Sequence, residues 1–331
     1  FHVSLGICIE FGKGFFENLV KKRKRQLDTT DYDFYNMVMK TRQGGLTNLN
    51  MECFNKPMQN TNSIDITSSY PYVMCNFKFP RYNEESLIFK GDTKEKIIKS
   101  TEFFEKFLLN GEKDRNNLIK GFFAWITLEN VKAKNINEEI VPLLPISVNK
   151  CYNDEKYGNK NIKSINGKVI SADRLDIRLN DIDYEQILLC YNFDFKICTE
   201  LYVSLKNEYL STGEISFLFN LFTEKQKLKP YKDVKTAEYN HIKAQINSNY
   251  GRKQMEIIRP IYILENGAVN EISTDDILSK VNAEQYLQEI NSNSVSIDIP
   301  SDGCYISSVA KLRLIKMSLL KLKKNKEMND K

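Results

Sequence analysis

The sequence has very little histidine, and none of its cysteines are paired. His2 and His241 are the only histidines in 331 residues, which argues against a metal centre built from histidine. The seven cysteines stand singly, with no Cys-x-x-Cys pair, at Cys8, Cys53, Cys75, Cys151, Cys190, Cys198 and Cys304. This spacing predicts a reduced protein and argues against a disulfide framework or a zinc site.

Long apolar runs and targeting signals are also missing. No apolar run approaches the roughly 20 residues that a membrane-spanning helix needs, and no charged-then-apolar signal opens the sequence. Hydrophobic residues make up 41% and charged residues 27%, as in soluble globular proteins. We therefore expect no membrane partner and no secretion. The first residue is Phe1 rather than Met, so we expect the chain to begin inside a longer one.

The charge is mildly basic, +5 from 48 basic and 43 acidic residues, which permits a polyanionic partner without proving one. Lys21 to Arg25 form an unbroken basic run. A second cluster comprises Lys225, Lys227, Lys229, Lys232 and Lys235. Runs of this kind are usually solvated surface, so their meaning depends on the motifs beside them.

The first motif is Asp65-Ile-Thr-Ser-Ser-Tyr-Pro. The alternating run Ser63–Thr67 predicts a strand, and Pro71 predicts a sharp turn after it. A carboxylate at a strand end beside backbone N–H groups is what phosphoryl transfer needs to hold magnesium against a triphosphate. Taken alone, the same residues fit a strand followed by a tight turn.

The second motif lies on the second of two helices expected over residues 213–229 and 235–250, the first ended by Pro230 and the second capped by Gly251. Lys243, Asn247 and Tyr250 stand at positions i, i+4 and i+7 and share one helix face. A cation, an amide and a ring suit a phosphate, a sugar and a base pair. Taken alone, this stripe also fits an ordinary amphipathic helix.

Other elements are clear from their patterns. Phe122–Leu128 predicts a buried strand, and a strand-rich segment is expected from Ile257 to Leu264. A polar helix is expected around Gln285. A last helix with an apolar stripe is expected over Cys304–Leu322, followed by a polar tail.

In this order, Asp-x-x-Ser-x-Tyr-Pro and Lys-x-x-x-Asn-Ser-x-Tyr-Gly resemble motifs A and B of family B DNA polymerases. The long segment between them and the insert after the second resemble the protein-primed branch of phages and linear plasmids. Gly44-Gly45 resembles that branch's Tyr-x-Gly-Gly motif, with Arg42 in place of the tyrosine. The resemblance spans about Arg42 to Leu322.

The resemblance implies a role for each matching residue. Asp65 is the expected catalytic residue and, with the Ile66 carbonyl, the expected ligand of Mg²⁺. Tyr70 would lie under the incoming sugar and exclude ribonucleotides. Nucleotide contacts fall to Ile66, Ser68, Ser69, Tyr70, Lys225, Lys243, Asn247 and Tyr250, with Lys227 and Lys229 as alternatives to Lys225. DNA contacts fall to Arg42, Gly44, Gly45 and Gly251.

The implied fold is α/β, a polymerase right hand with an antiparallel-sheet palm, two-helix fingers and inserted subdomains. The expected divisions are a connecting segment with the diglycine (1–50), palm with motif A (51–82), insertion and remaining palm (83–205), fingers with motif B (206–254), a second insertion (255–300) and a palm helix (301–331). The exonuclease and motif C regions are expected to be absent. Expected partners are template and primer DNA, dNTP and a terminal priming protein, in a bacterial cytoplasm or an organelle.

One departure from the family separates two functions. No Asp-Thr-Asp occurs, and Asp298 and Asp302 stand four apart before the last helix, which does not suit a metal pair. Asp183-Tyr-Glu185 has the spacing of a proofreading exonuclease but follows motif A, so a helix start is the better interpretation. The chain is either part of a DNA polymerase, with negligible activity in isolation, or a non-catalytic remnant that binds nucleic acid. An unrelated basic module would need both motifs by coincidence.

Overall fold

The computed structural model describes residues 31–46, 66, 68–109, 118–136, 139–141, 143–151, 158–254, 261–265, 268–272 and 299–329. Its helices are α3 (Tyr32–Thr41), α4 (Ser69–Asn76), α5 (Lys94–Phe107), η3 (Val148–Lys150), α6 (Asp181–Cys190), α7 (Thr212–Leu228), η4 (Lys229–Tyr231), α8 (Thr236–Lys253) and α11 (Pro300–Asn329). Its strands are β1 (Phe79–Arg81), β2 (Leu87–Phe89), β3 (Gly121–Ala133), β4 (Asn135–Ile136), β5 (Glu139–Ile140), β6 (Lys163–Ile165), β7 (Lys168–Asn180), β8 (Tyr191–Ser204), β9 (Lys206–Glu208), β10 (Ile261–Glu265) and β11 (Ala268–Ile272).

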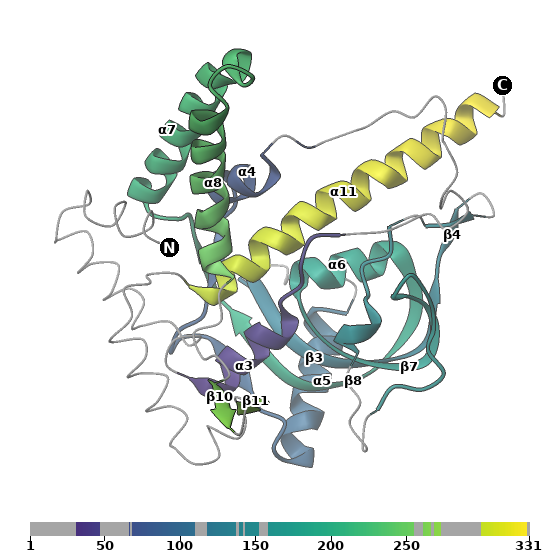
Figure 1. The fold of residues 1–331 in the computed structure, drawn as a ribbon. Helices are drawn as coiled ribbons and strands as arrows, with labels where there is room; N and C mark the ends of the chain where they lie inside the picture. Colours follow the sequence, from purple (N-terminus) through teal and green to yellow (C-terminus); the bar gives the residue numbers. More distant parts are fainter. Residues whose placement is uncertain are drawn as a thin grey trace.

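A five-stranded antiparallel sheet, ordered β2-β8-β3-β7-β6, is the centre of the fold. The expected strand Phe122–Leu128 is confirmed as part of β3. The pairing of β3 with β8 shifts register at three points, between Trp125 and Ile126, Thr127 and Leu128, and Glu129 and Lys132. Such irregularities bend a strand and increase its twist. Figure 1 shows the long strands curving around α6.

The sheet is buried on both faces, because alternate side chains of β3 enter two different cores. Phe122 and Ala124 belong to a core that also includes residues of α5 and α6. Phe123 belongs to a second core, together with residues of α3, α4 and the first turns of α11. The start of α11 therefore packs on the opposite face from α5, and Tyr305 meets Phe123 edge to face with ring centroids 5.5 Å apart.

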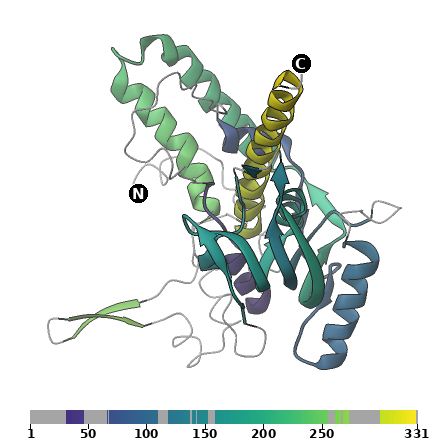
Figure 2. The same ribbon diagram turned by 90° about the vertical axis from the view of Figure 1, so that its right-hand side faces the viewer.

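Helices α7 and α8 form the expected antiparallel pair and project from the rest of the molecule (Figures 1 and 2). Pro230 lies in η4, the short connection between them. The expected end of α8 at Gly251 is wrong, because the helix continues to Lys253. A glycine in the last turn loses little, since the final carbonyls of a helix have no partners within it.

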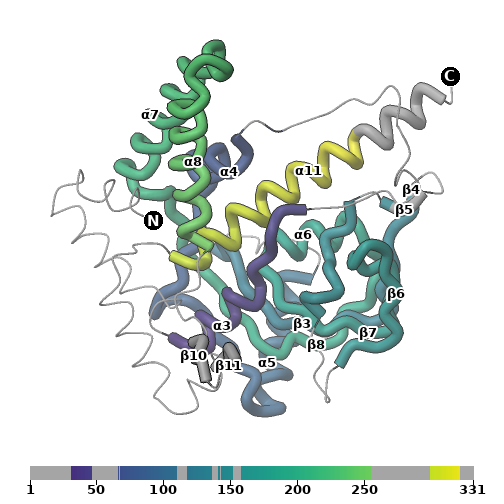
Figure 3. The backbone as a smooth tube through the Cα atoms, in the orientation of Figure 1, coloured from purple at the N-terminus to yellow at the C-terminus, as the bar shows by residue number. Residues whose placement is uncertain are grey.

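The last helix is longer than its apolar stripe predicts. It begins at Pro300 and ends at Asn329, so the expected polar tail after Leu322 is helical for most of its length. Its first turns lie beside the C-terminal end of α8 (Figure 3). Proline at the start of a helix is favourable because the first N–H groups have no acceptors within the helix. Helical periodicity does not require apolar residues once a helix leaves the core.

Some residues and elements discussed above lie outside the described residues: the strand Ser63–Thr67 apart from Ile66, Asp298 and the polar helix around Gln285. The strand-rich segment after α8 contains the β10–β11 hairpin. None of the helices in the described part of the chain has the length and apolar character that crossing a membrane requires.

A buried carboxyl group sits within the central sheet. Asp176 on β7 is 0% exposed, and its Oδ1 accepts hydrogen bonds from Trp125 Nε1 at 2.8 Å and Thr127 Oγ1 at 3.2 Å. Its Oδ2 has no hydrogen-bond partner among the described residues. Burial raises the pKa of Asp176 to about 6, against the opposing effect of these two donors.

Asp176→Asn should flatten part of the pH dependence of stability. An acid whose pKa is higher in the folded than in the unfolded state contributes stability below about pH 4 that is lost as pH rises through about 6. The effect amounts to at most about 3 kcal/mol. Chemical denaturation from pH 4 to 8 should show this loss in the wild type and not in Asp176→Asn. The exposed Asp173→Asn on the same strand is the control, and identical pH profiles for wild type and Asp176→Asn would contradict the assignment.

Candidate functional site

The first motif enters α4 through a left-handed residue. Ser68 has φ 51° and ψ 46°, a region that few residues other than glycine adopt, and α4 begins at the next residue. The turn is therefore at Ser68, and Pro71, expected to make it, lies in the first helical turn. Proline is tolerated there because its missing N–H would have no partner within the helix. The Ser69 Oγ atom is buried and has no hydrogen-bond partner among the described residues.

The predicted metal ligands are described only in part. Asp65 lies outside the described residues, whereas Ile66 is described and half-buried. Oxygen donors of this kind, a carboxylate and a carbonyl, are those that Mg²⁺ prefers. Within the described ranges, no group of three or more His, Cys, Asp or Glu side chains is arranged to hold a metal ion.

An aromatic stack joins the two motifs. The rings of Tyr70 on α4 and Tyr250 on α8 lie 3.9 Å apart between centroids, with 17° between their planes. Burial raises the pKa of Tyr250 far above its ordinary value, and the neighbouring Tyr70 raises it further. Two segments 180 residues apart in the sequence are thus in direct contact at the residues that the resemblance singles out.

Helix α7 adds a cation to this contact. Lys225 donates a hydrogen bond from Nζ to Ser68 Oγ at 3.2 Å, and its side chain is half-buried. Lys227 and Lys229, its alternatives in the sequence, are exposed. Of the three lysines, Lys225 is therefore the one placed against the N-terminus of α4.

The other two residues of the α8 stripe face solvent. Lys243 and Asn247 are both exposed, two helical turns and one helical turn before Tyr250, respectively. Because neither side chain is bonded to another described residue, both can contact a ligand without first breaking such bonds.

The diglycine lies beside the same stack. A Cβ atom added to Gly45 would lie 3.2 Å from the Tyr70 hydroxyl, whereas one added to Gly44 would meet nothing within 4 Å. The guanidinium of Arg42 donates to the backbone carbonyl of Gln254, just past the end of α8. Arg42 thus stabilises a helix C-terminus, where a cation is favoured. Gly251, also expected to contact DNA, is exposed on the last turn of α8.

Buried ion pairs hold these elements in place, and no pattern in the sequence predicted them. Lys253 Nζ lies 3.0 Å from Glu214 Oε1 of α7 and 3.8 Å from Asp302 Oδ2 of α11. Asp302 also binds Arg81 of β1 at 2.5 Å. Burial alone would raise the pKa of Glu214, but the Lys253 ammonium and a Ser211 hydrogen bond bring it below its ordinary value. Asp302, considered above as a metal ligand, is committed to these two cations.

The Asp183-Tyr-Glu185 segment has the helix-start structure expected for it. It lies in the first turn of α6, where Asn180 caps the helix by accepting from the Asp183 N–H at 2.8 Å. Asp183 is buried near Lys311 at 3.4 Å, and Glu185 pairs with Lys316 at 2.6 Å. Both carboxylates therefore have partners within the fold.

Solved structures with a similar fold include those of Phi29 DNA polymerase. An orthorhombic crystal form has a TM-score of 0.55 and 15% identity, covering 93% of this chain and 44% of the polymerase. The ternary complex with primer-template DNA and incoming nucleotides has a TM-score of 0.54 and 17% identity, covering 94% and 45%. The complex with single-stranded DNA has a TM-score of 0.50 and 16% identity, covering 93% and 43%.

These comparisons establish a fold. The chain is mixed α/β with antiparallel sheets and resembles part of that polymerase, spanning less than half of its length. No protein-family model matches the sequence, and no curated protein is similar to it.

The Tyr70–Tyr250 stack should appear as a coupling energy. Tyr70→Ala and Tyr250→Ala should each lower the free energy of unfolding. The double variant should lose about 0.5–1.5 kcal/mol less than the sum of the two single losses, because stacked aromatic pairs contribute about that much beyond their buried area. Denaturant unfolding of the four proteins measures it. A parallel cycle with exposed Tyr72, also on α4, should be additive. Additivity in the Tyr70 cycle would contradict the contact.

Proposed function

We propose that this chain is the nucleotide-binding part of a DNA-directed DNA polymerase of family B, from the protein-primed branch. The observation that carries the proposal is the contact between its two motifs: Tyr70 stacks on Tyr250, and Lys225 reaches Ser68. The similarity in fold to part of a DNA polymerase supports it. An unrelated basic module would have no reason to bring these two segments together.

The start of α4 suits the triphosphate of an incoming dNTP. Backbone N–H groups at the start of a helix have no partners within it and carry partial positive charge, so they bind phosphate. Here those groups belong to Ser69 and its neighbours, with the Lys225 ammonium close by. Lys243, exposed on α8, adds a second cation for the phosphates.

The rings and the amide select the rest of the nucleotide. Tyr70 would lie under the sugar, where a 2′-hydroxyl would collide with its ring. Tyr250 would pack against the new base pair, and Asn247 would help to seat the nucleotide. Because the rings of Tyr70 and Tyr250 are in direct contact, their stack would link recognition of the sugar to recognition of the base.

Asp65 and the Ile66 carbonyl would hold Mg²⁺, which supplies neutralisation of the triphosphate and of the charge that develops during transfer. The primer 3′-oxygen would form a bond to the α-phosphorus as the bond from that phosphorus to the oxygen bridging the α- and β-phosphates breaks. Pyrophosphate leaves, and the primer hydroxyl gives up its proton. Lys225 and Lys243 would stabilise the departing phosphates.

Lys243→Ala should weaken nucleotide binding without weakening DNA binding. With a dideoxy-terminated primer annealed to a template, the chain should bind the complementary dNTP in the presence of Mg²⁺ and favour it over the other three. Loss of a charged hydrogen bond to phosphate should lower this affinity about tenfold or more. Titration with a fluorescent DNA measures both affinities, and Lys227→Ala, an exposed lysine of α7, is the control.

Equal affinity for all four dNTPs, or an unchanged affinity in Lys243→Ala, would refute the assignment. DNA binding with no nucleotide binding at all would favour the non-catalytic remnant. The catalytic step has its own test, since the natural full-length protein should extend a primer with Mg²⁺ and dNTPs and lose this activity on Asp65→Asn.

The two glycines of the diglycine should differ in their tolerance of a methyl group. Gly45→Ala places Cβ 3.2 Å from the Tyr70 hydroxyl, so the ring must shift by a few tenths of an ångström. We expect dNTP affinity to fall about threefold to tenfold, because small displacements of positioning groups are costly. Gly44→Ala has open space around Cβ and should bind as the wild type does. The same titration measures both, and equal effects of the two substitutions would contradict a role for Gly45 in positioning Tyr70.

A further inference from the structure

One half-buried lysine has no counter-ion in the described part of the chain. Lys150 is the last residue of η3, and its ammonium group makes no hydrogen bond or ion pair with any described residue, although its backbone N–H donates to the Ser147 carbonyl at 3.0 Å. Burial lowers its pKa, and the positive charges of Arg42 and Lys311 lower it further. An ammonium ion that is partly removed from water and close to other cations is unfavourable unless an anion joins it.

A second lysine stands at the same corner of the sheet. Lys168, the first residue of β7, donates from Nζ to Ser147 Oγ at 2.7 Å, and the Val148 N–H donates to the Gly167 carbonyl at 2.9 Å. These bonds hold the segment that ends in Lys150 against the β6–β7 hairpin. Burial also lowers the pKa of Lys168, with Lys311 again adding repulsion. We call Lys150 and Lys168 the basic corner.

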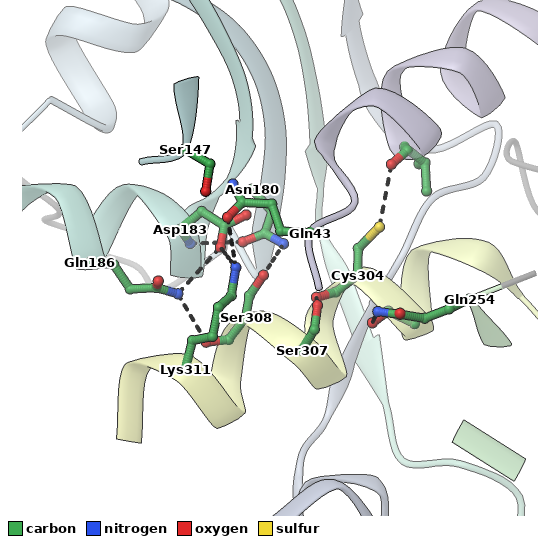
Figure 4. Close-up of polar contacts among 12 residues, drawn as sticks. Gln43, Ser147, Asn180, Asp183, Gln186, Gln254, Cys304, Ser307, Ser308 and Lys311 are labelled. Atoms are coloured by element: carbon green, nitrogen blue, oxygen red, sulfur yellow. Dashed lines mark hydrogen bonds and ion pairs between the residues drawn. The ribbon is translucent and has the colours of Figure 1, made fainter. Parts of the chain in front are cut away.

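The pocket beside the basic corner has more positive than negative charge. Its lining includes Lys150, Arg178, Gln43 and Asp183, and Asp183 is the single carboxylate among the lining residues. Figure 4 shows that Lys311 points at both Gln43 and Asp183, 2.9 Å and 3.4 Å from its Nζ. Asp183 is therefore already engaged by another cation, and it offsets the unfavourable surroundings of Lys150 only in part, because the pKa of Lys150 remains lowered.

The basic corner is linked to the proposed nucleotide site through the diglycine segment. Gln43, which lines the same pocket as Lys150, immediately precedes the diglycine, and Gly45 lies against the Tyr70 hydroxyl. A DNA strand that leaves the nucleotide site past the diglycine would therefore approach the pocket that Lys150 lines. A polyanion that extends away from the site is the ligand this path suits.

We propose that the basic corner binds backbone phosphates of the DNA strand that leaves the nucleotide site past the diglycine, through the ammonium groups of Lys150 and Lys168. This rests on the proposed function, since it assigns the DNA of that reaction a place on the protein. The contact carries no sequence preference, because phosphates are the same at every base.

The test is the salt dependence of DNA binding by the 331-residue chain. Lys150→Gln and Lys168→Gln should each lower the affinity for a fluorescent primer-template about threefold to tenfold at physiological salt. Each should reduce the magnitude of the slope of log K against log salt concentration by about 1, and the double variant by about 2. For each phosphate contact that is lost, DNA binding releases about one counter-ion fewer. Lys150→Arg should retain affinity and slope.

The controls separate the corner from charge in general. Lys163→Gln removes an exposed lysine of β6, at the same edge of the sheet, and should leave affinity and slope near those of the wild type. Thermal unfolding checks that the variants fold. Pyrophosphate, added at constant ionic strength, should not abolish the difference in DNA affinity between the wild type and Lys150→Gln. If pyrophosphate did abolish this difference, the corner would be a site for small phosphates, and the proposal would be overturned.

The possible failures are distinguishable. If the wild type binds DNA and complementary dNTP but Lys150→Gln has an unchanged affinity and slope, the basic corner is not a contact and the proposed function stands. If Lys163→Gln has the same effect as Lys150→Gln, the contact is not specific to the corner, and the proposal fails. If the wild type binds no DNA, both the corner and the function are refuted.

Discussion

Buried ion pairs fix the end of α8 against the start of α11, and the candidate site depends on them. Lys253, Asp302 and Arg81 are each no more than 4% exposed. Each such ion costs several kcal/mol to remove from water, and only a well-placed partner offsets this cost. Alternative positions of α8 would separate Lys253 from Glu214 and Asp302 and leave charges buried without partners. Tyr250, one turn earlier on the same helix, inherits this fixed position, and so does its stack with Tyr70.

The backbone at this junction reinforces the ion pairs. A side chain at Gly303 would collide with the carbonyl of Lys253, so the two helices can approach this closely only because α11 carries glycine there. Gln254 then donates from Nε2 to the Gly303 carbonyl at 3.2 Å, and Arg42 donates to the Gln254 carbonyl. The diglycine segment, α8 and α11 are thereby joined by consecutive hydrogen bonds, which help to hold Gly45 beside the Tyr70 hydroxyl.

Local sequence patterns predicted the elements of this site better than their contacts. The helices that carry Lys225 and Tyr250 follow from apolar spacing and from Pro230, and a shared helix face follows from the interval between Lys243 and Tyr250. Helix ends were less predictable. Glycine is a common helix cap, but α8 continues for two residues beyond Gly251. The contacts at this end of the helix are made by α11 and Arg42, which are distant in the sequence. The burial of Asp302 was also unpredictable, because its partners Arg81 and Lys253 lie in two distant segments. The position of Asp65, central to the chemistry, remains a prediction.

Four partly or fully buried lysines, Lys150, Lys168, Lys253 and Lys311, fall into two groups, and the difference between them has a physical meaning. Lys253 and Lys311 are almost fully buried and each lies near a carboxylate, Glu214 or Asp183, so the fold itself compensates their charge. Lys150 and Lys168 keep partial access to solvent and have no carboxylate partner among the described residues. A lysine that serves packing alone can place its ammonium group in water at little cost, since its stem is flexible. Lys150 and Lys168 are held at one corner of the sheet although Lys311 repels both of them. An anion that binds from solution explains this arrangement better than packing does, and the nearby diglycine and Tyr70 indicate the direction from which it comes.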